Sequence, residues 1–201
     1  MNRRRWLLWL GLFVFLISGC SYVQGYLDIA RDRGVSKEYL AVLNDWTRSQ
    51  VVYSQFETRV RITATFKGSA YQAAYLAEYA RIYQMGDEDK KGRAETLKTL
   101  EGDFAEIFFY AYVPDKDYND FEKPRSVWTV FLLDGSGRRI EPVELRRIEK
   151  ITPVILDFFP YVNQHYGNLY SLKIPPVSDG DFRKLKLVLT GVLGRVELTW
   201  K

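Results

Sequence analysis

The chain of 201 residues has few of the residue types on which many catalytic and metal sites depend. It contains one cysteine, one histidine and two methionines. One cysteine excludes an intramolecular disulfide, and one histidine excludes metal sites built from paired histidines or several cysteines. Seven prolines and 14 glycines are too few for a collagen-like or low-complexity chain, and 15% aromatic residues argue against disorder. What remains is a globular chain with room for one sizeable core.

The sequence also lacks an apolar run long enough for a transmembrane helix, which needs about 20 residues. The apolar run near the start covers residues 6–17 and is 12 residues long. It follows three consecutive arginines and ends before Ser18, Gly19 and Cys20. A positive segment, a short apolar segment and small residues at its end form a secretory signal. The start of the chain is therefore predicted to be a secretory signal peptide.

The sequence Ile17-Ser18-Gly19-Cys20 resembles the lipobox of bacterial lipoprotein precursors. The resemblance implies a diacylglycerol on the Cys20 thiol, cleavage just before Cys20, and acylation of the new amino terminus with a fatty acid such as palmitate. Ile17 departs from the commonest leucine but keeps an aliphatic side chain. A lone thiol at the end of a signal fits an attachment point better than an incidental cysteine. Two or more acyl chains hold a protein on a bilayer stably.

The same resemblance divides the chain and gives it a location. Residues 20–35 are expected to be a lipidated tether, and residues 36–201 a single domain in the cell envelope. Ser21 follows the cysteine where an inner-membrane lipoprotein would carry aspartate. In a cell with two membranes this resembles lipoproteins of the outer membrane that face the periplasm. The membrane, reached through the lipid anchor, is the first predicted partner.

The formal net charge of +4 belongs mostly to the predicted signal. Residues 1–19 hold three arginines and no acid, so the rest of the chain has 26 basic and 25 acidic side chains. The remaining basic clusters, such as Arg59 with Arg61 and Arg146 with Arg147, are interleaved with acids. This pattern predicts solvated strand faces. Because nucleic-acid binding needs a contiguous basic surface, we expect no nucleic-acid partner.

Helix signals concentrate in the first half of the chain. Ser36 fits an N-cap for a helix over residues 37–47, and Gly68-Ser69 precede a helix over residues 70–85. A shorter helix is predicted over residues 93–100. In the second half, Thr152-Pro153 predict a helix that ends before Pro160.

Every fourth residue of the predicted helix over residues 70–85 is a tyrosine, from Tyr71 through Tyr75 and Tyr79 to Tyr83. One hypothesis is an aromatic platform for sugars or peptides. The favoured interpretation is that the rings pack on a sheet and the alanine side faces solvent or a neighbouring helix.

Strand signals dominate the rest. Residues 56–66 alternate between apolar and polar side chains, and residues 104–113 are almost continuously apolar, which is typical of a central strand. Residues 126–133 and 139–148 are predicted to pair across the Asp134–Gly137 turn, with Pro142 marking an edge or a bulge. Further strands are predicted over residues 168–174, 184–193 and 195–200. The fold class is therefore α+β, either a mainly antiparallel sheet or a β-sandwich, with helices concentrated in the N-terminal half.

The sequence contains few candidates for catalytic or metal-binding residues. His165 has no catalytic context, and no phosphate-binding glycine loop occurs. The acidic loop of Asp115, Asp117, Asn119 and Asp120 resembles the start of an EF-hand loop but has Asp120 at the glycine position and Ser126 at the glutamate position. An acidic surface loop is the favoured interpretation, and calcium binding remains open. We therefore assign no catalytic residue, metal ligand or cofactor site.

Three functions remain, in order of preference. The first is a non-catalytic interaction or assembly module that contacts other envelope proteins through a sheet edge or a helical face. The second is binding of a small apolar or lipid-like ligand. Its cavity would be lined by five aromatic residues, namely Phe158, Phe159, Tyr161, Tyr166 and Tyr170. The third is an envelope hydrolase, because catalytic carboxylates can lie far apart in a sequence.

Overall fold

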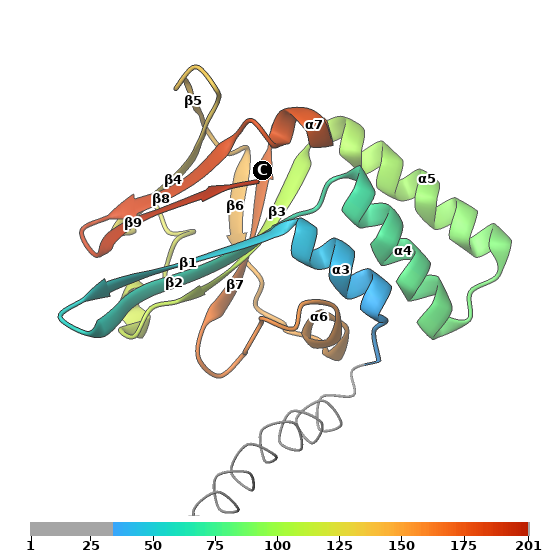
Figure 1. Ribbon diagram of the computed structural model, residues 1–201, viewed down its shortest axis with the longest axis horizontal. Helices are drawn as coiled ribbons and strands as arrows, with labels where there is room; N and C mark the ends of the chain where they lie inside the picture. The colour runs from blue at the N-terminus through green and yellow to red at the C-terminus, as the bar shows by residue number, and fades with distance from the viewer. Residues whose placement is uncertain (1–33, 201) are drawn as a thin grey trace, which may run out of the picture. The chain divides into compact units, whose positions relative to one another are not determined.

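Two antiparallel sheets form the framework of the computed structural model, which describes residues 34–200 (Figure 1). The large sheet has five strands in the order β1 (Thr47–Ser54), β2 (Glu57–Phe66), β3 (Ala105–Tyr112), β7 (Asn168–Ile174) and β6 (Glu144–Arg147). The small sheet has four, in the order β5 (Arg139–Ile140), β4 (Trp128–Leu133), β8 (Lys186–Gly191) and β9 (Gly194–Thr199).

The helices lie mainly before residue 104, so the predicted α+β class and the predicted distribution of helices are confirmed. They are α3 (Lys37–Asp45), α4 (Ser69–Tyr83), α5 (Asp87–Asp103), α6 (Pro153–Phe158) and α7 (Asp179–Phe182), with a short 3₁₀ turn η1 (Lys116–Tyr118). Ser36 caps α3 by accepting from the Tyr39 amide, and Thr152 caps α6 by accepting from the Ile155 amide, as predicted. No helix among residues 34–200 is long and apolar enough to cross a membrane.

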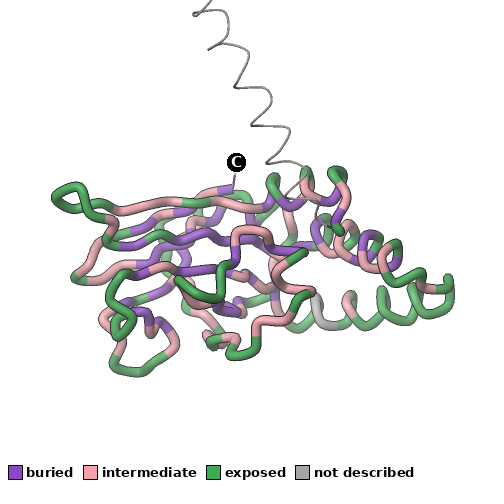
Figure 2. The backbone as a smooth tube through the Cα atoms, turned by 90° about the horizontal axis from the view of Figure 1, so that it is seen from below, coloured by how far each residue is buried: buried purple, intermediate pink, exposed green. Residues whose placement is uncertain are grey.

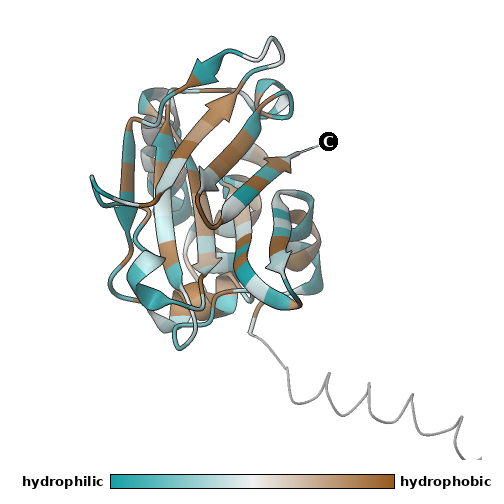
Figure 3. Cartoon of the chain, turned by 90° about the vertical axis from the view of Figure 1, so that its left-hand side faces the viewer, coloured by the Kyte–Doolittle hydropathy of each residue, from teal (hydrophilic) through white to brown (hydrophobic). Residues whose placement is uncertain are grey.

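The core lies between the two sheets. On the inner face of the large sheet, Phe66 stacks on Phe182 and Phe109 stacks on Tyr170, with ring centroids 3.5 and 4.8 Å apart. Phe121 lies against Trp128 of the small sheet and the Tyr170 ring of the large one. Figure 2 shows the buried residues running along the strands, and Figure 3 shows hydrophobic stretches on several strands beside hydrophilic ones. This layer follows from the alternation of apolar residues in the strands.

Two parts of the strand prediction are wrong. The prediction missed β1 and placed Phe56 on the buried side of the next strand, whereas Gln55 and Phe56 form the two-residue turn between β1 and β2. Both have positive φ, 50° and 68°, and the Phe56 side chain is fully exposed. This turn escaped the prediction because such turns usually carry asparagine and glycine.

The second error concerns the region after the Asp134–Gly137 turn. In place of one strand over residues 139–148, the chain forms β5 in the small sheet and β6 in the large sheet. Pro142 lies between them, because it cannot continue a ladder of hydrogen bonds. The helix predicted over residues 93–100 is also longer, since α5 begins at Asp87 and ends at Asp103. Helix α7 was not predicted at all.

Candidate functional site

The residues predicted from the lipobox, Gly19 and Cys20, lie outside the described residues, as do the signal peptide over residues 1–19 and almost all of the tether. Cleavage and lipidation therefore remain predictions.

The five aromatic residues that the sequence placed around one cavity are not brought together. Tyr170 is completely buried between the two sheets, on the inner face of the large sheet. Phe158 and Phe159 are buried against helix α4, where they contact Tyr75 and Tyr71 respectively. Tyr161 and Tyr166 line an open groove on the outer face of the large sheet. That part of the ligand-binding hypothesis is wrong.

The tyrosine ladder of α4 forms part of the core at one end and part of the surface at the other. Tyr71 is completely buried, and its hydroxyl lies 2.9 Å from that of Tyr39, which in turn donates to the Phe158 carbonyl. Tyr83, three turns later, is half exposed. The alanines at positions 73 and 77 face solvent. The interpretation that the rings pack inward is thus confirmed for the first turns of the helix.

The acidic loop uses its side chains in local structure. Asp115 caps η1, and Asp120 accepts a hydrogen bond from Ser126. Asn119 is buried, donating its amide to the Ala111 carbonyl and accepting from the Tyr170 hydroxyl. His165 is exposed. Among the described residues, no group of three or more histidine, cysteine, aspartate or glutamate side chains is placed to hold a metal ion.

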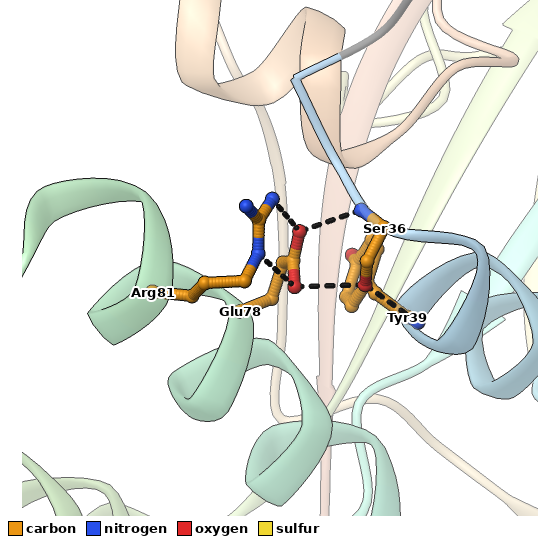
Figure 4. Close-up of polar contacts among 4 residues, drawn as sticks. All are labelled: Ser36, Tyr39, Glu78 and Arg81. Carbon is orange, nitrogen blue, oxygen red and sulfur yellow. Dashed lines mark hydrogen bonds and ion pairs between the residues drawn. The ribbon is translucent and has the colours of Figure 1, made fainter.

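A buried carboxylate joins the first two helices (Figure 4). Glu78 of α4 accepts from the Ser36 amide at 2.6 Å and from the Ser36 hydroxyl at 2.8 Å. Arg81 donates to the same carboxylate from the other side, at 2.6 and 3.1 Å. The hydrogen bonds from Arg81, helped by those from Ser36 and opposed by burial, lower the pKa of Glu78 to about 2. This clamp holds the start of α3 on α4 and so acts on the fold.

The outer face of the large sheet carries polar side chains in rows that cross the strands. Thr47 and Thr65 form one row, Ser49 and Thr63 the next, and Val51 and Arg61 the third. Strand β3 extends these rows with Phe108, Tyr110 and Tyr112 respectively. The Thr65 row is covered, because the Tyr161 hydroxyl lies 2.8 Å from the Thr65 hydroxyl and Phe159 packs on Phe108. The other two rows form the floor of the groove.

This groove, which we call the tyrosine groove, has a volume of about 550 Å³. Its lining residues come from three neighbouring strands and from the segment that follows α6. They are Ser49, Val51, Arg61, Thr63, Tyr110, Tyr112, Tyr161, Asn163 and Tyr166. Four of these nine are tyrosines, and none is an acid.

One wall of the tyrosine groove is held in place by Tyr110. Its hydroxyl donates to the Asn163 carbonyl at 3.0 Å. Gly167 allows the wall to approach, since a Cβ there would lie 2.4 Å from the Ala111 carbonyl and 2.6 Å from the Tyr110 hydroxyl. Tyr166, next to this glycine, is 64% exposed. The wall is therefore held close to β3, and it carries the exposed side chain of Tyr166.

Arg61 gives the tyrosine groove its charge. None of the ion pairs among the described residues involves Arg61, although most other strand arginines have an acidic neighbour, such as Arg139 with Glu141. Burial raises the pKa of Tyr110, and the charge of Arg61 opposes that rise. The groove is thus a positive, aromatic and hydroxyl-rich surface.

The carboxylates with shifted pKa values lie outside the tyrosine groove. Burial opposes ionisation of Glu106, but the ammonium group of Lys67 at 2.5 Å outweighs it and lowers the pKa. Hydrogen bonds likewise lower the pKa values of Asp134 and Glu197 in the small sheet and its turn. No carboxylate or histidine lines the tyrosine groove.

Sequence reasoning found part of this site. Tyr161 and Tyr166 were singled out, but as members of a different cavity. Arg61 was interpreted as part of a solvated strand face, since nothing in the sequence reveals that it lies opposite Tyr112 on another strand. Alternation along residues 57–66 does put Arg61 and Thr63 on one face, and that is the one signal available. No family model, curated protein or solved structure matches the chain.

Proposed function

We propose that the protein is a membrane-anchored envelope lipoprotein that acts as a non-catalytic interaction module and binds an acidic segment of a partner protein in the tyrosine groove. The observation that carries the proposal is Arg61, a cation without an acidic partner among the described residues, on an uncovered sheet face beside four tyrosines. Tyrosine and arginine are the residue types that dominate the binding energy of protein interfaces.

The edges of the large sheet are less suited to binding. Along β1, Arg48 donates to the Thr199 carbonyl and Gln50 accepts from the Glu197 amide, so β9 covers that edge. At the opposite edge, β6 is four residues long and carries charged side chains. Short, charged edge strands disfavour pairing with another chain. The open face of the sheet is therefore a better contact surface than either edge.

The chemistry of the tyrosine groove defines the partner. A carboxylate can form two parallel hydrogen bonds with the planar guanidinium of Arg61. Apolar side chains next to that carboxylate would pack on the rings of Tyr112 and Tyr166. A volume of about 550 Å³ holds on the order of 18 non-hydrogen atoms at about 30 Å³ each. This corresponds to two or three residues of a bound chain.

Site-specific photocrosslinking in cells tests this surface. A photoreactive phenylalanine analogue is placed at Tyr166 in the groove or at Tyr83 on α4, two exposed tyrosines of 64% and 50% exposure. We expect a discrete crosslink to another protein from position 166 and none from position 83. Equal crosslinking from both positions, or crosslinks from 166 only to lipid or glycan, would contradict the proposal.

Charge reversal supplies the matched control. Arg61→Glu, made in the chain with the photoreactive group at 166, should reduce the crosslink by about thirtyfold, the effect of losing a hot-spot contact of about 2 kcal/mol. Arg125→Glu makes the same charge change at another exposed arginine that does not line the groove. If both variants lose the crosslink equally, long-range charge and not the groove explains the binding.

The anchor has its own test, independent of the groove. Cys20→Ala should abolish incorporation of labelled palmitate and shift the protein out of the membrane fraction, since Cys20 is the only thiol in the chain. Unchanged labelling and fractionation would refute lipidation at Cys20 without affecting the crosslinking result.

A further inference from the structure

The hydroxyl groups on the floor of the tyrosine groove have fixed directions of hydrogen bonding. Ser49 donates its only hydroxyl proton to the Ile62 carbonyl at 3.1 Å. The hydroxyl oxygens of Ser49 and Thr63 lie 2.9 Å apart. Because the Ser49 proton is already used, Thr63 donates to Ser49, and neither hydroxyl has a proton left for a bound molecule. Ser49 is exposed whereas Thr63 is buried, so a partner meets Ser49 as an acceptor.

The Tyr161 hydroxyl, also in the lining of the groove, is fixed by a longer chain of hydrogen bonds. Its oxygen lies 2.8 Å from that of Thr65, which lies 2.7 Å from that of Thr47. Thr47 donates to the Leu43 carbonyl at 2.6 Å. Because the chain ends on a carbonyl, which can only accept, Tyr161 donates to Thr65 and Thr65 donates to Thr47. The Tyr161 oxygen is therefore left with acceptor capacity only.

Tyr110 completes this set, because its hydroxyl donates to the Asn163 carbonyl. Burial raises the pKa values of Tyr110 and Tyr161, so both hydroxyls keep their protons at neutral pH. The hydroxyl oxygens of Ser49, Tyr110 and Tyr161, which we call the acceptor set, can thus accept a hydrogen bond but cannot give one. In the next row of the floor, the Arg61 guanidinium can only donate. The tyrosine groove therefore places a charged donor next to a set of neutral acceptors.

The spacing of the rows sets the spacing of the groups that fit them. Arg61 and Thr63 are two residues apart on β2, and Ser49 pairs with Thr63. Residues two apart on an extended strand point to the same face and lie about 6.6–6.8 Å from each other. An extended segment that runs along these strands repeats this spacing with its own side chains at positions i and i+2. The volume of about 550 Å³ matches the two or three residues of such a segment.

We propose that the partner segment carries a carboxylate and, two residues away, the primary amide of an asparagine or glutamine. The carboxylate pairs with Arg61, and the amide donates to the acceptor set. A second carboxylate at the amide position would face oxygens that have no proton to offer. An ammonium group there would be repelled by the charge of Arg61. This inference rests on the proposed function and adds the residue type that the groove selects.

Matched peptides bound to the full-length protein in phospholipid nanodiscs test this selection. The probes are capped, fluorescently labelled peptides with the core Asp-Leu-Gln or Asp-Leu-Glu, and the same pair with the core reversed, because a segment can run along the strands in either direction. Fluorescence anisotropy gives each affinity, with empty nanodiscs as the reference. In one of the two directions, the glutamine peptide should bind about tenfold more tightly than the glutamate peptide, the effect of one hydrogen bond.

The outcomes separate this inference from the proposed function. Attraction by charge alone would favour the glutamate peptides, which carry one more negative charge. If they bind as tightly as the glutamine peptides in both directions, and Arg61→Glu abolishes the binding, selection for an amide is overturned while the groove stays the binding site. Absence of saturable binding, or binding that Arg61→Glu leaves unchanged, would overturn both.

The Ser49→Ala variant assigns the acceptor. It removes the oxygen that accepts from the amide, and it leaves the Thr63 proton without its acceptor. The preference for glutamine over glutamate should therefore fall from about tenfold to about one. Ser54→Ala, the same change at an exposed serine of β1 that does not line the groove, should retain the preference.

This readout is a ratio of two affinities within one variant, so a loss of stability does not mimic it. A preference that survives in Ser49→Ala, or that Ser54→Ala removes to the same extent, would contradict the assignment to Ser49.

Discussion

The large sheet has one face that builds the core and another that is only partly covered, and the two are made from the same strands. On the inner face, Phe66, Phe109 and Tyr170 are completely buried against the small sheet. On the outer face, α4 and the α6 segment cover the Thr65 row but leave the Arg61 row open. Residues that build the core therefore alternate along β2 and β3 with the residues that we propose to bind a partner.

The largest expected loss of stability follows from a substitution on the inner face of the large sheet. Phe109→Ala should lower the free energy of unfolding by about 3–5 kcal/mol, because it removes a ring that stacks on Tyr170 and meets Phe121 edge-on. Tyr112→Ala, three positions later on the same strand but in the groove, should cost less than about 1 kcal/mol. Urea unfolding of both variants measures the difference. Similar losses would mean that the two faces contribute equally to stability.

The stability that the contact between α3 and α4 gives to the fold should depend on pH. The folded-state pKa of Glu78, about 2, lies below its ordinary value of 4.5. Glu78 therefore stabilises the fold fully above about pH 5, and this contribution is lost as the pH falls through 2. We expect a contribution of about 2 kcal/mol, since the half-exposed Arg81 is screened by solvent.

The Glu78→Gln variant isolates this effect from that of other carboxylates. Its free energy of unfolding should be lower than that of the native chain at pH 6, and the difference should shrink as the pH is lowered toward 2. A difference that stays constant over this range would show that the Glu78 charge does not hold α3 on α4.

A smaller effect, an increase in stability, is expected from substitutions in the two-residue turn between β1 and β2. The double substitution Gln55→Asn/Phe56→Gly should raise the free energy of unfolding by about 1–2 kcal/mol, since both positions have positive φ. The fully exposed Phe56 ring offers no packing that would offset this gain. A lower melting temperature for the double variant would show that the ring contributes to the fold after all.

The smallest effect on stability is expected in the tyrosine groove. Arg61→Ala should change the free energy of unfolding by less than about 0.5 kcal/mol, since Arg61 is exposed and belongs to none of the ion pairs among the described residues. The same variant should lose the crosslink from position 166. A large loss of stability would make Arg61 a structural residue and remove the main support for the proposed function.

The parts of the molecule that could be predicted from sequence depend on local physics. Thr152-Pro153 specify a helix start through the cap and the fixed φ of proline, and the Asp134 turn has its glycine at a positive φ of 85°. The strand over residues 168–174 has its predicted bounds. By contrast, the Gln55-Phe56 turn carries no local signal, so β1 went undetected.

The candidate site could not be predicted because it depends on register and on long-range contacts. Arg61 belongs to the groove only because β2 pairs with β3 so that Arg61 lies opposite Tyr112. That pairing is not contained in the spacing of residues along the chain.

Chemical footprinting of tyrosines in intact cells and in the purified protein tests the central claim most directly. If a partner occupies the tyrosine groove, Tyr166 and Tyr112 should react about tenfold less in cells than after purification, while Tyr83 and Tyr53, exposed outside the groove, should react equally in both. Groove tyrosines that react as strongly in cells as in the purified protein would contradict the account.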